Sequence, residues 1–231
     1  MKRAAVLLLL ALSAIAVPAH ADSDIFLLGF SGFDYESPNP NPGTYLAIGE
    51  GYKALGFVTS FGTFLAPYVD IATNQYTYSY YDLTVQTRDY YPEFDYLEVG
   101  FANSGRGRFY EDDLTTGTHA GYGVNPPNAT APSTFTDGTV FLGGHIDFLV
   151  LSYDFGAQQG AFSGNISFDE GSLLGHIPVA QRDGWILSGL AGGSNPSIPP
   201  GYDHQIDGEC RVPGPTPATH RTWGALKALY R

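Results

Sequence analysis

The clearest pattern along the chain lies between residues 139 and 168, where two apolar segments flank a short stretch bounded by glycines. Residues 146–155 carry apolar side chains on both of their alternating faces, which is typical of a strand covered on both sides. Residues 161–168 alternate between apolar and polar side chains, as a half-buried strand does. The five residues between them suit a hairpin loop because Gly stands at both ends. The pattern predicts a central β-hairpin.

Further strand signals flank this hairpin on both sides. They are rich in Tyr, Phe, Thr and Val, and they are separated by the turn-forming residues Gly, Pro, Asn and Asp. The expected strands cover residues 24–33, 56–65, 76–87, 94–101, 106–110, 185–190 and 202–212. Residues 111–137 lack periodicity and predict a long loop, and residues 173–183 predict a connector with one helical turn. This spacing predicts an all-β fold, with a single antiparallel β-sandwich of the jelly-roll type.

The N-terminus predicts export from the cell. Basic residues at positions 2 and 3 precede an apolar run over residues 4–17, and Ala19 and Ala21 fit the small-x-small cleavage pattern. We therefore expect a signal peptide over residues 1–21, cleaved after Ala21, and a secreted or cell-surface protein. Because the run is shorter than the ~20 residues that span a bilayer, we expect no transmembrane span in the mature chain.

Charge and cysteine content narrow the function classes. The chain has 11 basic and 23 acidic residues and a formal net charge of −12, which disfavours nucleic acid as a partner. Its single cysteine, Cys210, cannot form an internal disulfide, so the fold must depend on its hydrophobic core. We expect Cys210 to be a small buried side chain, with an intermolecular link or a reactive thiol as alternatives.

The composition changes after residue 212. A proline-rich spacer is followed by a short segment that contains Trp-Gly and ends in Leu-Tyr-Arg, so we divide the chain into residues 1–21, 22–212 and 213–231. The last segment resembles the C-terminal sorting tails of uncharacterised secreted proteins of Gram-negative bacteria, of the Val-Pro-Glu-Pro type. It lacks the Glu of that pattern and an apolar segment of membrane length. The resemblance covers this segment alone and implies delivery rather than an activity; the alternative is a disordered terminus.

The densest polar cluster lies between residues 203 and 209. On a strand, Asp203, Asp207 and Glu209 share one face, and their oxygens could bind Ca²⁺. The spacing approaches that of a calcium-binding loop, but the third position is glutamine and the twelfth is glycine, where a bidentate carboxylate is needed. The alternative is a solvated polar strand face. We expect no other cofactor.

The tyrosine-rich strand offers a second kind of candidate site. Tyr76, Tyr78 and Tyr80 lie on one face of the predicted strand, with Leu83 and Val85 on the other. Three tyrosines in a row could form a platform on which sugar rings stack, because each combines an apolar face with a polar tip. The alternative is that they belong to the core or to an ordinary sheet surface.

No motif in the chain points to catalysis. The histidines of the mature chain lack metal-binding spacing, and no Gly-x-Ser-x-Gly elbow, phosphate-binding glycine loop or dinucleotide fingerprint occurs. The acidic run at residues 111–113 is expected to be solvated and to pair with Arg106 and Arg108. The sequence thus favours a non-enzymatic protein.

Three hypotheses for function follow from these patterns. The first is a non-catalytic exported β-sandwich protein with a surface, matrix or adhesive role, whose partners are polysaccharide or cell-envelope components. The second is a carbohydrate-binding jelly-roll module that uses the tyrosines, with Ca²⁺ assisting. The third is a secreted hydrolase whose site is assembled from dispersed residues.

Overall fold

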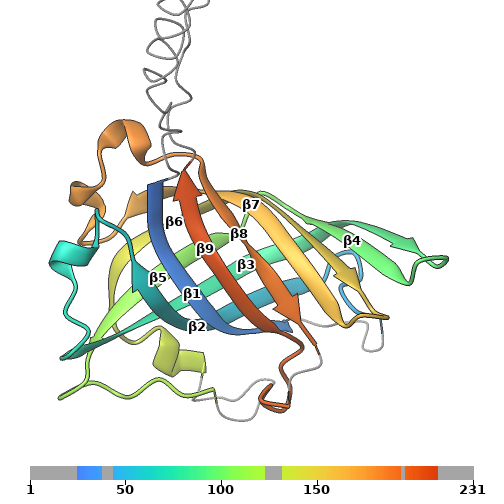
Figure 1. Cartoon of the computed structure of the whole chain (residues 1–231), viewed down its shortest axis with the longest axis horizontal. Helices are drawn as coiled ribbons and strands as arrows, with labels where there is room; N and C mark the ends of the chain where they lie inside the picture. Colours follow the sequence, from blue (N-terminus) through green and yellow to red (C-terminus); the bar gives the residue numbers. More distant parts are fainter. Residues whose placement is uncertain (1–24, 38–43, 123–131, 194–195, 213–231) are drawn as a thin grey trace, which may run out of the picture. The chain divides into compact units, whose positions relative to one another are not determined.

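Figure 1 shows the computed structural model of the chain. It describes residues 25–37, 44–122, 132–193 and 196–212. The predicted signal peptide of residues 1–21 and the predicted tail of residues 213–231 lie outside the described residues. Both stay predictions.

The described residues fold into nine strands and four short 3₁₀ helices. The strands are β1 (Ile25–Glu36), β2 (Gly51–Phe61), β3 (Asn74–Tyr91), β4 (Tyr96–Phe101), β5 (Arg106–Asp113), β6 (Thr139–Asp154), β7 (Gln159–Glu170), β8 (Trp185–Gly192) and β9 (Gln205–Val212). The 3₁₀ helices are η2 (Ala66–Tyr68), η3 (Pro132–Phe135), η4 (Leu174–His176) and η5 (Val179–Gln181). The all-β prediction is confirmed. Among the described residues, no helix is long and apolar enough to cross a membrane.

The sheet closes on itself as an antiparallel barrel (Figure 1). Its strand order is β2-β1-β9-β8-β7-β6-β4-β3-β5, and the ring is completed by pairing of β2 with β3 and of β6 with β5. Strands β4 and β5 share one position in the ring, because β5 pairs with the first half of β3 and β4 with its second half. The prediction of a sandwich is therefore wrong. Alternating apolar residues fit either architecture, and only the pairing of distant strands distinguishes them.

The inner face of the barrel is filled with packed side chains. Phe30 of β1 lies 4.8 Å from Tyr78 and 5.5 Å from Tyr80 between ring centroids, and it also contacts Phe162 of β7. Strands β1 and β2 approach closely at Gly32, where an added Cβ would lie 2.1 Å from the Leu55 carbonyl oxygen. Such an approach requires glycine.

A bulge in β3 changes which of its residues share a face. Asp82 has a φ of 56°, and after it Leu83 and Val85 are buried in the same core cluster as Tyr78. The prediction that these two residues lie on the opposite face from the tyrosines is wrong, because a bulge shifts the alternation by one residue.

The connection between β5 and β6 and the connection between β8 and β9 cover part of the outer face of the barrel. Phe33 and Leu55 point away from the barrel interior and pack in a second cluster with Phe135 of η3 and Tyr202. Strand β1 is thus covered on both sides. The sequence predicted this for residues 146–155, but Phe148 on the outer face of β6 is 46% exposed.

Candidate functional site

The three tyrosines predicted as a sugar platform lie inside the barrel. Tyr76, Tyr78 and Tyr80 are all buried, and Tyr78 has no solvent exposure at all. Burial raises the pKa of all three hydroxyls. A ring packed in the core leaves no face for a ligand that arrives from solvent. The structure places these residues in the core, which was the alternative to a platform.

The three carboxylates predicted as a calcium site are held in different surroundings. Asp207 accepts a hydrogen bond from the Gln205 side chain at 2.9 Å, and Glu209 forms an ion pair with Arg211. Asp203 precedes β9 and lies beside the buried side chains at the end of the barrel. Among the described residues, no group of three His, Cys, Asp or Glu side chains could hold a metal ion.

Three exposed aromatic residues lie instead on the hairpin that β3 forms with β4, while Tyr68 and Phe148 are exposed elsewhere. Strand β3 runs to Tyr91, four residues beyond its predicted end, and Figure 1 shows this hairpin reaching beyond the other strands. Tyr90 is 44% exposed, Tyr91 40% and Phe94 71%. Tyrosine side chains are thus exposed at the end of β3 and buried in its first half.

A pocket of about 400 Å³ opens where this hairpin meets the end of β6 and the connection between β1 and β2. We call it the hairpin pocket; its lining residues are Thr44, Tyr45, Arg88, Tyr90, Asp95 and Phe155. The Phe155 ring stands edge-on to Tyr45 and Tyr90, with centroid distances of 6.3 and 6.2 Å. Three aromatic rings therefore converge on one open space.

Polar groups fix the orientation of these rings. The Tyr90 hydroxyl donates a hydrogen bond of 2.7 Å to the Asp95 carboxylate, and this bond raises the pKa of Tyr90. The Arg88 guanidinium lies 5.9 Å from the Tyr90 ring centroid, within the range of a cation–π contact, and its Nε donates to the Tyr45 carbonyl at 3.3 Å. The pocket thus combines aromatic faces with a fixed cation and a fixed acceptor.

A buried polar cluster supports the pocket from inside the barrel. The Tyr45 hydroxyl lies 3.1 Å from Nδ1 of His204, and that nitrogen lies 3.2 Å from a carboxyl oxygen of Asp34. The Tyr52 hydroxyl donates to the other Asp34 oxygen at 3.0 Å. Burial lowers the pKa of His204, but the carboxylates around it, Asp34 first and then Asp203 and Glu36, more than offset this, and the net shift is upward. Tyr45 is therefore held both by the core and by the hairpin.

The neighbouring Asp203 responds to the same surroundings. Asp203 is exposed as a residue, but the protein packed around its carboxyl group partly removes that group from water and raises its pKa to about 7, and the nearby carboxylates of Asp34 and Glu36 add to the shift. Carboxylates placed close together disfavour the ionised form of one another.

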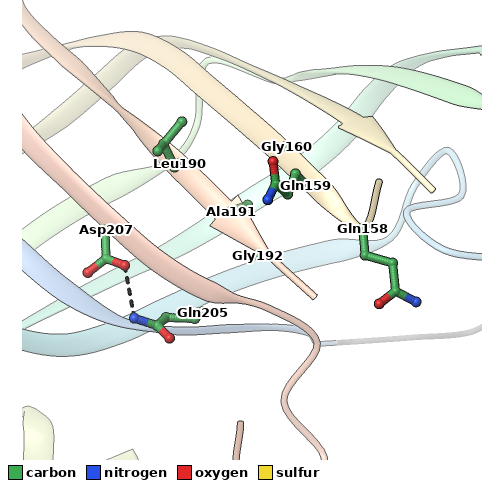
Figure 2. Close-up of a pocket in the computed structure, with 8 residues that line it drawn as sticks. All are labelled: Gln158, Gln159, Gly160, Leu190, Ala191, Gly192, Gln205 and Asp207. Carbon is green, nitrogen blue, oxygen red and sulfur yellow. Dashed lines mark hydrogen bonds between the residues drawn. The ribbon is translucent and has the colours of Figure 1, made fainter. Parts of the chain in front are cut away.

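A second concavity lies on the outer face of β7, β8 and β9, and Figure 2 shows its lining. We call it the amide groove; it has a volume of about 290 Å³, and its lining includes Gln158, Gln159, Leu190, Gly192, Gln205 and Asp207. The Gln205 side chain donates to Asp207, and Leu190 is 66% exposed. The groove combines amide and carboxylate groups with apolar surface, to which the exposed Leu190 belongs.

An ionic network on the outer face of β5, β6 and β7 is the other concentration of charge. Arg106 pairs with Asp169 at 2.7 Å and with Glu170 at 2.9 Å, and Arg108 pairs with Glu170 at 2.8 Å. His145 lies 3.2 Å from Asp169. Each of these groups already has a partner within the network. We therefore interpret the network as a structural link between β5, β6 and β7.

The acidic run at residues 111–113 has other partners than predicted. Glu111 accepts a hydrogen bond from the Tyr76 hydroxyl at 2.8 Å, and Asp112 accepts one from the Gln75 side chain at 2.9 Å. Both donors come from β3, which pairs with β5 in this register. The two arginines of β5 point to β7 instead.

The sequence did not identify the residues of the hairpin pocket, although it contains one signal for them, a cluster of aromatic residues. Tyr, Tyr, Phe and Tyr fall within residues 90–96, around a Pro-Glu pair, which is a dense aromatic group for a turn. Phe155 was placed in a covered strand, and nothing in its local pattern shows that β6 ends beside the hairpin.

No protein-family model, curated protein sequence or solved structure matches this chain.

Proposed function

We propose that the protein is a non-catalytic, exported carbohydrate-binding protein that acts at the cell surface or in the surrounding matrix. The hairpin pocket is its sugar-binding site. The observation that carries this proposal is the convergence of three aromatic rings with Arg88 and Asp95 in one pocket open to solvent.

The chemistry of the pocket suits a sugar ring. A pyranose has an apolar face of C–H groups that packs on aromatic rings, and Tyr45, Tyr90 and Phe155 provide such surfaces. Sugar hydroxyls both donate and accept hydrogen bonds. Arg88 supplies several N–H donors, and the Asp95 carboxylate accepts. Pockets that combine an apolar lining with a few fixed polar groups are typical of small-ligand sites.

The arrangement favours binding over hydrolysis. Glycoside hydrolysis requires two carboxyl groups about 5–10 Å apart on either side of the scissile bond. Among the described residues that line the hairpin pocket, Asp95 is the only carboxylate. Asp34 and His204 could serve acid–base chemistry, but they lie in the core behind Tyr45, and Asp34 has no solvent exposure.

Two features of the sequence support action outside the cell. Residues 1–21 have the layout of a secretory signal peptide. The acidic composition favours solubility and disfavours anionic partners, which leaves polysaccharide among the abundant polymers of an envelope or matrix.

The test compares two tyrosines that are adjacent in β3 and similarly exposed. The purified protein is applied to immobilised neutral and acidic polysaccharides, together with Tyr90→Ala, Asp95→Ala and the control Tyr91→Ala. We expect Tyr90→Ala to weaken binding about tenfold or more, since one lost ring contact is worth about 1.4 kcal/mol, while Tyr91→Ala binds like the parent chain. Equal losses in both tyrosine variants, or no binding to any polysaccharide by the parent protein, would refute the proposal.

A further inference from the structure

The amide groove and the hairpin pocket share one structural element. Phe155 of the pocket and Gln158 of the groove both belong to the turn between β6 and β7. Two residues lie between them, and the three steps of the chain from one to the other span at most about 11 Å even when fully extended. The two concavities therefore flank a single turn.

The turn is fixed to the strands on both of its sides. The Phe155 backbone N–H donates to the Asp95 carbonyl at 2.9 Å, which ties the turn to the hairpin of β3 and β4. The Gly193 backbone N–H donates to the Gln158 carbonyl at 3.0 Å, which ties it to the end of β8. A ligand that crossed the turn would therefore contact a backbone that is hydrogen-bonded to neighbouring strands on both sides.

The groove presents groups that match sugar hydroxyls. Each glutamine amide has both a donor and an acceptor end, and the Gln205–Asp207 pair places an amide beside a carboxylate. The exposed Leu190 offers an apolar contact for the C–H face of a ring. The space over Gly192 in the groove is open, because an added Cβ at this residue would meet no atom within 4 Å.

The charge of the groove narrows the ligand class. Asp207 is the only charged side chain among its described lining residues, and the chain as a whole is acidic. An anionic polymer would be repelled here, whereas a neutral one would meet amides and an acceptor.

We infer that the amide groove is a second binding site for the ligand of the hairpin pocket, and that the protein holds an extended, neutral polysaccharide chain across the turn between β6 and β7. This inference rests on the proposed function. Linked contacts to one chain raise its affinity without any change in the affinity of each contact, provided that the chain spans both sites. Affinity should therefore increase with the length of the oligosaccharide.

The experiment blocks the groove without touching the pocket. Gly192→Leu fills the open space over this half-buried residue, and Gly175→Leu is the control outside the groove, because an added Cβ at the exposed Gly175 likewise meets nothing within 4 Å. Binding is measured by calorimetry with neutral glucose, mannose, galactose and N-acetylglucosamine oligomers, from disaccharide to octasaccharide. A galacturonic acid series of the same lengths serves as the anionic comparison.

We expect the parent protein and Gly175→Leu to bind the longest neutral oligomers about tenfold or more tightly than the shortest, and Gly192→Leu to lose that gain while binding short oligomers normally. If Gly192→Leu keeps the gain with length, the groove is not the second site, and if the anionic series shows the same gain, the ligand is not a neutral chain. Either result overturns the inference, and the hairpin pocket still stands as a sugar site. If no oligomer of any length binds the parent protein, the proposed function itself fails.

Discussion

Removal of the Asp34 carboxyl group tests how the buried polar cluster holds the end of the barrel. Asp34 has no solvent exposure, and the His204 backbone N–H donates to its Oδ1 at 2.7 Å. The Tyr52 hydroxyl donates to its Oδ2 at 3.0 Å, and the His204 ring lies 3.2 Å from Oδ1. Asp34→Ala removes the acceptor and leaves these donors inside the protein.

The expected loss of stability follows from the buried donors that lose their acceptor. A buried donor without a partner costs about 1–3 kcal/mol, and breaking a buried charged pair costs about 3–5 kcal/mol in total. These figures describe overlapping contacts and do not add. We therefore expect Asp34→Ala to lower the free energy of unfolding by about 3–5 kcal/mol, a large part of the usual 5–15 kcal/mol. Asp34→Asn keeps one oxygen as acceptor and should cost about 1–2 kcal/mol.

Urea unfolding followed by the fluorescence of the buried Trp185 measures the loss. The unfolding midpoint should fall in the order parent, Asp34→Asn, Asp34→Ala, with an unchanged dependence on urea concentration. Glu98→Ala, at an exposed position of β4, should stay within about 0.5 kcal/mol of the parent. A loss below about 1 kcal/mol for Asp34→Ala would show that the cluster does not depend on this carboxyl group. If Asp34→Ala fails to fold, Asp34→Asn still provides the graded measurement.

Two other predictions concern residues in or beside the barrel interior. Because the pKa of Asp203 is raised from 3.8 to about 7, the folded protein holds more protons than the unfolded chain between about pH 4 and about pH 7, and the raised pKa of His204 adds to this difference above pH 6.5. The melting temperature should therefore fall as pH rises through this range, and Asp203→Asn should flatten the decline; equal slopes in both proteins would contradict this origin. Tyr78→Phe removes a buried hydroxyl that has no hydrogen-bond partner among the described residues, so its stability should equal the parent's or exceed it by up to about 1 kcal/mol. A clear loss in urea unfolding would reveal a partner for that hydroxyl.

The sequence predicted the elements of the fold well, because strands and tight turns leave local signals. The hairpin of β6 and β7 was predicted from alternation and from the two glycines of its turn, and residues 146–155 and 161–168 do pair in the structure. Cys210 is buried as expected, and burial raises the pKa of its thiol. The connector at residues 173–183 contains short 3₁₀ turns.

The candidate site was predicted less well, because alternation identifies a face but does not show what packs against it. The first half of β3 faces the barrel interior, and Tyr78 there is buried. Tyr90 in the second half of the same strand is exposed, because the hairpin reaches beyond the other strands. The sequence thus found the tyrosine-rich strand but selected its buried end.

The sequence by itself determined that this chain is built of antiparallel strands around an aromatic core without a disulfide. Residue spacing and turn chemistry act over a few neighbouring positions, and those positions can be read in order. Only the tertiary structure decided that the sheet closes into a barrel and that Asp34 meets His204, 170 positions away. It also placed Phe155 beside Tyr90. Such contacts depend on which strands pair across long separations and where a bulge shifts the alternation, and neither leaves a local pattern.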